Sequence, residues 1–323
     1  MTEQEILDFI KKAQIDTSVA AGIVSPQDAA EFIDLTREQT AILDVIRVES
    51  EIRKSLNLDT LTLGEPVVVA GQEGVEPDAA DVVAAGRSRA TLTPTEILAA
   101  FDVTYSWLRK AITHAARGIS EEEGRRRALE ALNQLFAKRF GKDVVMIAFN
   151  GDTALPSDTR TNKALRVVDG FIKQMQADAD VHDVVIPANP SYNTQVFPAM
   201  LQALPKDYRD DRDELGFFVS ANVYDAYAME IGSRATALGD MLLAGPWQRN
   251  LSYLGITLYP VFRLGDGKIL LTPKENLAVG FGQEMTNESE RKPRARKVEV
   301  TITAEMDVKY ALGDALVLGD DGA

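Results

Sequence analysis

The stretch LEALNQLFAKRFGKDVVMIAFNGD, residues 129–152, carries the clearest structural pattern in this chain. Its first half repeats large apolar side chains at intervals of three or four residues, which places them on one face of a helix. These side chains are Leu129, Leu132, Phe136 and Phe140. Its second half, VVMIAF at residues 144–149, is apolar on every side and is therefore expected to be buried. The sequence Asn150-Gly151-Asp152 then indicates a turn.

The same helix is expected to begin upstream of this stretch. Ser120 and Glu123 have capping-box spacing, so their side chains can satisfy two free N–H groups at the start of a helix. Glutamates at positions 121–123 each precede an arginine by four residues, in the order that stabilises a helix. We therefore predict a helix from residue 120 to about residue 149, about 45 Å long at about 1.5 Å per residue. Its apolar stripe should pack on a sheet formed by residues 277–281 and 298–310.

Residues 57–104 change to a period of two, which is typical of strands. Apolar residues alternate with others near residues 61–69 and again in the segment that contains Ile97 and Phe101. We expect two long antiparallel strands joined by a wide loop at residues 71–89. An isolated hairpin is marginally stable, so its apolar faces, including Ile97 and Phe101, should be covered by another copy of the chain.

The remaining segments are predicted more briefly. Residues 1–56 indicate interrupted helix, in which Ser25-Pro26 starts a second helical segment. Residues 181–269 mix strand and helix signals, with strands at 184–186, 217–219 and 256–261 and a helix at 223–238. Further strands are expected at 268–272, 277–281 and 298–310. The last residues, 319–323, are expected to be disordered.

Composition limits the class of protein. The chain has 323 residues, of which 45% are hydrophobic and 26% charged, the usual balance of a soluble globular protein. The absence of cysteine excludes disulfides, thiolate catalysis and cysteine-ligated metal sites. Its net charge of −14 disfavours general DNA binding, which depends on neutralising phosphates. Apolar runs such as residues 144–149 are far shorter than the roughly 18–20 residues that cross a bilayer, and the acidic N-terminus does not resemble a secretory signal.

No catalytic, cofactor-binding or metal-binding residue is predicted. His114 and His182 lack metal-ligand spacing and are expected to be surface or packing residues. P-loop, GxSxG and GxGxxG motifs are absent. Asp152 and Asp158 have two interpretations, a general acid–base pair or turn residues that bond to nearby backbone, and the second is favoured because nothing else around them supports catalysis.

Three further features bear on binding to DNA or to other copies of the chain. The charged run at residues 206–214 is expected to be a solvated loop. The basic stretch at residues 291–297 has two open interpretations: it pairs with the acidic surface of the next copy, which is favoured, or it contacts DNA. Trp107 and Trp247 are expected to be core or interface anchors, since no basic residues alternate with them.

Several stretches, in order, resemble the major capsid proteins of tailed bacteriophages with the Hong Kong 97 type fold. They lie at residues 22–35, 89–108, 129–152, 216–245, 253–260 and 270–281. Residues 110–119 do not match that pattern. The resemblance implies an α+β fold with five parts: a helical N-terminal arm (1–56), an extended β-hairpin loop (57–104), a peripheral domain with a long spine helix (105–180), an axial α/β domain (181–269), and return strands with a C-terminal tail (270–323).

The resemblance also implies a function. The chain would self-assemble into hexamers and pentamers that tile an icosahedral shell around double-stranded DNA, contacting that DNA weakly. Its partners would be other copies of itself, a portal, and possibly scaffold or decoration proteins. It would lie in the virion capsid, and in the host cytoplasm during assembly, with no cofactor and no membrane. Two alternatives stay open: an encapsulin-like bacterial nanocompartment shell and, more remotely, a carboxylate-dependent hydrolase.

Overall fold

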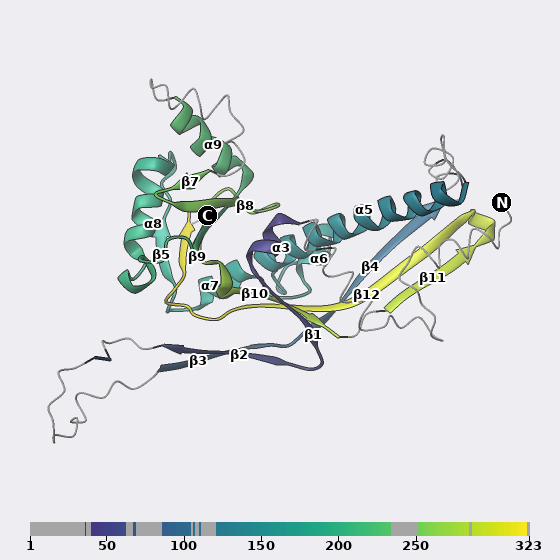
Figure 1. Ribbon diagram of the computed structural model, residues 1–323, viewed down its shortest axis with the longest axis horizontal. Coiled ribbons are helices and arrows are strands. Elements are labelled where there is room, and N and C mark those ends of the chain that lie inside the picture. Colours follow the sequence, from purple (N-terminus) through teal and green to yellow (C-terminus); the bar gives the residue numbers. More distant parts are fainter. Residues whose placement is uncertain are drawn as a thin grey trace, which may run out of the picture.

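The structure is a computed structural model that describes residues 36, 40–62, 67–68, 86–104, 106, 110, 121–233, 251–283 and 286–321. Within these, the main chain alone is described at residues 61–62, 121–134, 287–289, 291 and 298. The described elements form an elongated molecule with a compact unit at one end, a long helix with adjoining strands at the other, and a two-stranded ribbon that leaves the body (Figure 1).

A five-stranded sheet, here called the peripheral sheet, supports the elongated end. The central strand is β12 (Lys297–Tyr310), which pairs antiparallel with β4 (Thr95–Thr104) on one side. On its other side lie β11 (Thr286–Lys292) and β10 (Leu277–Gly282), both antiparallel to it. The sheet ends at β1 (Arg47–Ile52), parallel to β10. The predicted strands at 277–281 and 298–310 are therefore confirmed.

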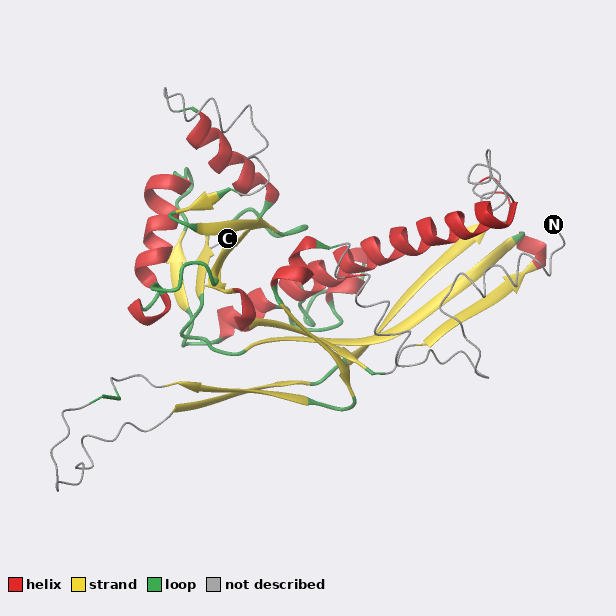
Figure 2. Cartoon of the chain, in the orientation of Figure 1, coloured by secondary structure: helices red, strands yellow, loops and turns green. Residues whose placement is uncertain are grey.

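The long helix α5 (Glu121–Asn150) lies along this sheet, as Figure 2 shows, and confirms the helix predicted over residues 120–149. Ser120 and the side chain of Leu132 lie outside the described part of the chain. Phe140 packs against the core cluster that contains the inward residues of β10 and β12, as predicted. Phe136 instead stacks on Phe101 of β4, with ring centroids 4.0 Å apart.

The compact unit is built on a six-stranded sheet, here called the axial sheet, with the order β5-β13-β9-β6-β8-β7. Its strands are β5 (His182–Val185), β13 (Val317–Asp320), β9 (Lys268–Pro273), β6 (Leu215–Val219), β8 (Ile256–Pro260) and β7 (Ser252–Tyr253). The strands predicted at 184–186, 217–219, 256–261 and 268–272 are confirmed within one or two residues.

Both faces of the axial sheet are covered, which is why every residue of β6 is buried. One face packs on α8 (Phe197–Ala203) and α9 (Ala221–Gly232), through a cluster that includes Phe197 and Phe217. On the other face, Phe218 belongs to the core that also contains the VVMIAF end of α5 and the helix α7 (Phe171–Ala177). The two sheets therefore share one hydrophobic core.

Six short elements complete the body. They are α3 (Ala41–Val45), α6 (Arg160–Leu165), the π-turn η1 (Tyr192–Val196) and the 3-10 turns η2 (Lys206–Tyr208), η4 (Lys274–Asn276) and η5 (Pro293–Ala295). Of these, η4 carries the chain from the axial sheet to the peripheral sheet.

The ribbon corrects the predicted hairpin. Strand β2 (Leu56–Thr62) pairs with β3 (Gly86–Leu92), not with the segment that contains Ile97 and Phe101. That segment is β4 of the peripheral sheet, where Ile97 is buried and Phe101 faces α5. The expectation that another copy covers these two side chains was wrong, because their own chain supplies the helix and the neighbouring strand.

Other boundaries also differ from the predicted ones. Residues 47–52 of the predicted helical arm form a strand, while the helices expected before residue 36 lie outside the described residues. The predicted division at residue 270 falls within β9. Residues 317–320, expected in part to be disordered, form β13 because they are inserted between β5 and β9. The helix predicted at 223–238 is α9, and residues 234–250 are not described.

Candidate assembly surfaces

The root of the β2–β3 ribbon is packed tightly against the peripheral sheet. Leu58 and Leu92 are buried in a cluster with Ile52 and Ala278. The cluster closes over Gly280, where a Cβ atom would approach Ile52 Cδ1 to 2.6 Å. A side chain at this position would require the ends of Ile52 and Leu92 to shift, so glycine lets them close over the sheet here.

A buried carboxylate holds the corner where the ribbon meets the sheet. Asp307 of β12 accepts hydrogen bonds from the N–H of Thr93 at 2.7 Å and from the N–H of Val308 at 2.8 Å. Burial raises the pKa of Asp307, although these bonds and the charge of Lys309 oppose the rise. Among the residues whose burial is described, it is the one buried carboxylate, and it binds backbone amides. No sequence pattern singled it out.

The opposite face of the ribbon is polar. Asp59 of β2 pairs across the strands with Arg87 at 2.8 Å and with Arg89 at 2.6 Å. These arginines, Arg89 first, lower the pKa of Asp59 to about 2. The period of two along each strand places the three charges on the same side, away from buried Leu58 and Leu92.

A ladder of alternating charge crosses the tip of the peripheral sheet. Lys297 pairs with both Asp102 and Glu299 at 2.7 Å, and Lys292 pairs with Glu299 and, at 3.8 Å, with Glu290. The two lysines lower the pKa of Glu299, and the carboxylates raise those of Lys292 and Lys297. Part of the basic stretch at 291–297 is therefore neutralised within the chain.

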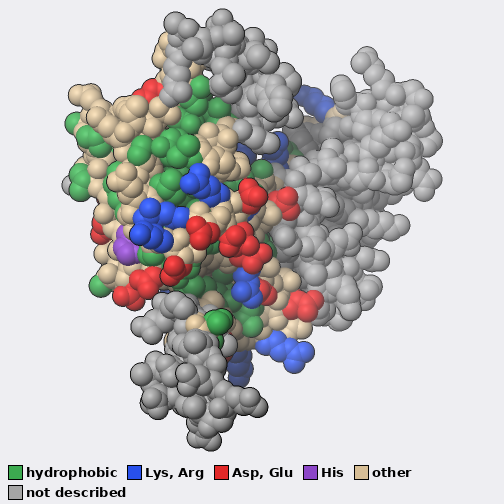
Figure 3. All heavy atoms as spheres, turned by 60° about the vertical axis from the view of Figure 1, so that its left-hand side comes forward, with side chains coloured by type: hydrophobic (Ala, Val, Ile, Leu, Met, Phe, Trp, Pro, Cys, Tyr) green, Lys and Arg blue, Asp and Glu red, His purple; other side chains and the backbone are tan. Residues whose placement is uncertain are grey.

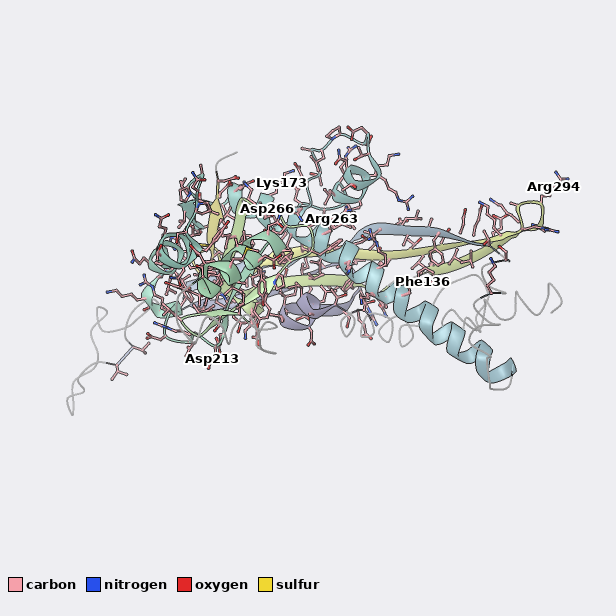
Figure 4. All side chains as sticks on the ribbon, turned by 90° about the horizontal axis from the view of Figure 1, so that it is seen from above. Phe136, Lys173, Asp213, Arg263, Asp266 and Arg294 are labelled. Atoms are coloured by element: carbon pink, nitrogen blue, oxygen red, sulfur yellow. The ribbon has the colours of Figure 1, made fainter. Side chains whose placement is uncertain are left out.

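Two arginines of the same stretch remain at the surface. Arg294 and Arg296 lie in and directly after η5, at the β11–β12 turn, and both are exposed. Neither has an ion-pair partner among the described residues. Figure 4 places Arg294 at one extremity of the molecule and Asp213, from the charged run, in the compact unit at the other. These two regions therefore cannot pair within one chain.

The compact unit presents a mixed surface. Residues 206–214 are exposed or half-buried, which confirms the expected solvated segment, although it begins with the short turn η2. Figure 3 shows Lys and Arg side chains lying among Asp and Glu side chains on this face. His182 is half-buried on β5, and its Nε2 lacks a hydrogen-bond partner. His114, Trp107 and Trp247 lie outside the described residues.

The two aspartates after α5 bond to nearby backbone, as predicted: Asp152 accepts from the N–H of Ala154 at 2.9 Å and Asp158 from the N–H of Thr159 at 2.7 Å. Asp152 accepts from Lys173 Nζ at 2.5 Å, and this bond is the largest cause of its lowered pKa. Lys173 also pairs with Asp169 at 2.8 Å. Asp158 instead accepts from Asn162 Nδ2 at the start of α6. The structure thus assigns Asp152 and Asp158 to different partners, and they do not form a facing pair.

Two further properties of the described residues concern metal sites and membrane spans. No group of three or more His, Asp or Glu side chains among them is arranged to hold a metal ion. None of the helices in the described part of the chain is long and apolar enough to cross a bilayer.

Comparisons with known proteins give the class of this fold. The chain matches a chain of the satellite phage P4 procapsid that includes the size determination (Sid) protein, with a TM-score of 0.62 and 15% identity, over 91% of this chain and 99% of the other. It matches the capsid of an empty GTA particle with a TM-score of 0.55 and 13% identity, over 88% and 90% of the two chains. The fold is therefore the phage capsid fold of the Hong Kong 97 type.

A sequence comparison points to the same class of protein. The chain is 25% identical over 327 aligned positions to YqbE of Bacillus subtilis (strain 168), which is named as a prophage capsid protein, and the match covers 98% of this chain and 97% of that one. None of the protein-family models matches the chain. The similarities in fold and in sequence both support a structural protein of a phage capsid shell.

Proposed function

We propose that this protein assembles, as hexamers and pentamers of identical copies, into an icosahedral shell around double-stranded DNA. The observation that carries the proposal is the β2–β3 ribbon, which projects from the body (Figure 1). In the described part of the chain, its buried contacts lie at its root, around Leu58 and Leu92. A two-stranded ribbon is marginal alone, so the remainder gains support from an adjacent subunit.

The charge distribution supports contacts between copies. A net charge of −14 keeps the shell wall from binding DNA tightly. Against this acidic background, the exposed Arg294 and Arg296 find their complement on the acidic surface of the next copy. Contact with packaged DNA is the competing interpretation for these two side chains.

Other partners follow from the assignment as a shell subunit. A filled shell needs a portal through which DNA enters, and a scaffold or decoration protein fits the same assembly. The protein would assemble in the host cytoplasm and end in the virion capsid. The encapsulin-like nanocompartment is not favoured, because the curated relative is named as a prophage capsid protein. A hydrolase gains no support, since Asp307 is the single buried carboxylate among residues of described burial.

Electron microscopy and light scattering of the purified protein test this proposal. We expect capsomers or closed shells under some condition of salt, pH or crowding. Persistent monomers under all of them would contradict it. Particles that contain protein cargo in place of DNA, when purified from their native host, would favour the nanocompartment.

A further inference from the structure

Three segments carry the chain between the peripheral and axial parts of the fold. Residues 178–181 lead from α7 to β5, residues 273–276 lead from β9 to β10, and residues 311–316 return from β12 to β13. The third segment contacts both of the others. Its Gly313 lies so close to the first that a Cβ atom would be 2.9 Å from Asp178 Oδ2.

Asn276 joins the second and third of these segments. Its side-chain Oδ1 accepts the N–H of Ala311 at 3.1 Å and the N–H of Leu312 at 2.8 Å. Its Nδ2 donates to the C=O of Leu312 at 2.9 Å and to Thr272 Oγ1, at the end of β9, at 3.0 Å. An asparagine amide offers two donors and two acceptor positions, and all four are used here.

These bonds are made in a buried setting. Asn276 is 6% exposed and Thr272 is fully buried. Leaving buried polar groups unpaired is costly, so each bond strongly favours the geometry that satisfies it. Tyr310 adds a second tie, because its hydroxyl donates to Asp178 Oδ2 at 2.7 Å. The third segment, together with the end of β12 that leads into it, is thus bonded to both of the other segments.

The apolar core alone does not set the orientation of the axial sheet relative to the peripheral sheet. Residues from both sheets, including Phe218 and Val279, share one hydrophobic cluster with α5. Apolar burial favours contact but has little directionality, whereas hydrogen bonds depend steeply on distance and angle. The hydrogen bonds among the three linking segments are therefore the interactions able to select one orientation of the axial sheet relative to the peripheral sheet.

We infer that Asn276 is a positioning residue that holds the axial sheet at one orientation to the peripheral sheet. It does so by accepting hydrogen bonds from Ala311 and Leu312 of the third segment, which joins that segment to η4. This inference goes beyond the proposed shell function and concerns the geometry of a single subunit. It holds for free subunits and for assembled ones.

The chain lacks cysteine, so two engineered cysteines can carry spin labels without background. Leu98 on β4 and Val185 on β5 are 65% and 80% exposed, and they report the distance between the two sheets. Leu98 with exposed Arg294 reports distances within the peripheral sheet alone. Labelled chains diluted into unlabelled protein give intramolecular distances by double electron–electron resonance, whether or not shells form.

In Asn276→Ala we expect a broader or shifted distance distribution for the pair Leu98 and Val185, and an unchanged one for Leu98 and Arg294. The amide proton of Leu312 should also exchange faster, because Asn276 Oδ1 is its acceptor. Asn222→Ala is the matched control, since Asn222 bonds to Asp266 on the surface of the compact unit and should leave both distances unchanged.

Two conservative variants carry the test if Asn276→Ala does not fold. Thr272→Val removes one bond of Asn276 and keeps the side-chain shape, and Tyr310→Phe removes the bond to Asp178. Each should broaden the distance between the sheets. An unchanged distribution in folded Asn276→Ala, or in both conservative variants, would overturn the inference. Equal broadening of the within-sheet pair would overturn it too, because it would show general loosening.

Discussion

Asp307 on β12 accepts the main-chain N–H of Thr93 at 2.7 Å, and this bond connects the 14-residue central strand to the corner from which the ribbon leaves. The contact lies directly across from Gly280, over which Leu92 and Ile52 close. The corner of the ribbon is therefore held by a hydrogen bond to one buried carboxylate, beside a glycine over which two apolar side chains close.

The first prediction concerns this carboxylate. In Asp307→Ala, both bound N–H groups lose their acceptor. Loss of such a buried bond is expected to reduce the free energy of unfolding by about 1–3 kcal/mol. Denaturant unfolding of the variant and the wild type measures this. Asp183→Ala, at an exposed position on β5, is the control and should be near neutral.

The same variant has a predicted pH dependence. Burial raises the pKa of Asp307 in the folded state, so the folded protein keeps its proton to higher pH than the unfolded chain does. The stability from this group is therefore present below the unfolded pKa and is lost as pH rises through the folded pKa. The difference between wild type and Asp307→Ala should be larger at pH 3.5 than at neutral pH. A difference that grows toward neutral pH would contradict the burial argument.

The second prediction concerns the polar face of the ribbon. The carboxyl of Asp59 should titrate at about 2 by NMR at low salt, because Arg89 and Arg87 favour its charged form. Any stability from this cluster is present above the ordinary aspartate pKa and is lost as pH falls toward 2.

Two variants separate the causes. Arg89→Ala should raise the pKa of Asp59 more than Arg87→Ala does, because the bond from Arg89 is the largest cause of the shift. High salt should also raise it toward its ordinary value, since the cluster is exposed. A titration midpoint that neither variant changes would show that the ribbon is not paired in this register.

The third prediction concerns Phe136. The sequence pattern alone predicted a core position, at which a change to alanine costs about 3–5 kcal/mol. Phe136 is half-buried and stacks on half-buried Phe101, so a smaller loss is expected. A double-mutant cycle with Phe101→Ala should give a coupling of about 0.5–1.5 kcal/mol.

Phe149→Ala is the comparison for this series. Phe149 is fully buried in the core shared by the two sheets, so its loss should reach the full range of about 3–5 kcal/mol. If Phe136→Ala destabilised the protein as much as Phe149→Ala, the half-buried position of Phe136 would be wrong.

The fourth prediction concerns the exposed arginines at the β11–β12 turn. Reversing Arg294 and Arg296 to Glu should impair shell formation even without DNA, because both would then face an acidic neighbour. Wild-type assembly should also weaken with added salt, since exposed charges are screened over about 8 Å at physiological ionic strength.

A matched reversal at the two ends of α6, Arg160→Glu with Arg166→Glu directly after it, changes the net charge equally at two exposed positions and should have less effect. Assembly is followed by sedimentation and electron microscopy. If empty shells of the Arg294 and Arg296 variant form normally and only filled particles are affected, DNA is the partner and the contact between copies is withdrawn.

The local sequence pattern was sufficient to predict an element where the periodicity of that segment alone indicates a helix or a strand. The stripe that contains Phe136 and Phe140, together with the apolar VVMIAF run, predicted α5 almost to the residue. The alternation in residues 298–310 likewise predicted β12. The charges at 206–214 predicted a solvated segment, because an alternating charged run cannot be buried without partners.

Only the tertiary structure decided how these elements combine. Ile97 and Phe101 alternate as any half-buried strand does, and alternation says nothing about whether the covering surface comes from the same chain or another. Here it comes from α5 and β12. In the same way, Asn276 and Asp307 belong to no motif, because each bonds to residues that are distant in sequence and that meet only in the folded chain. The sequence by itself determined which segments form helices and which form strands, since periodicity is local. The pairing of the strands and the contact between the two sheets depend on long-range contacts, so the tertiary structure decided them.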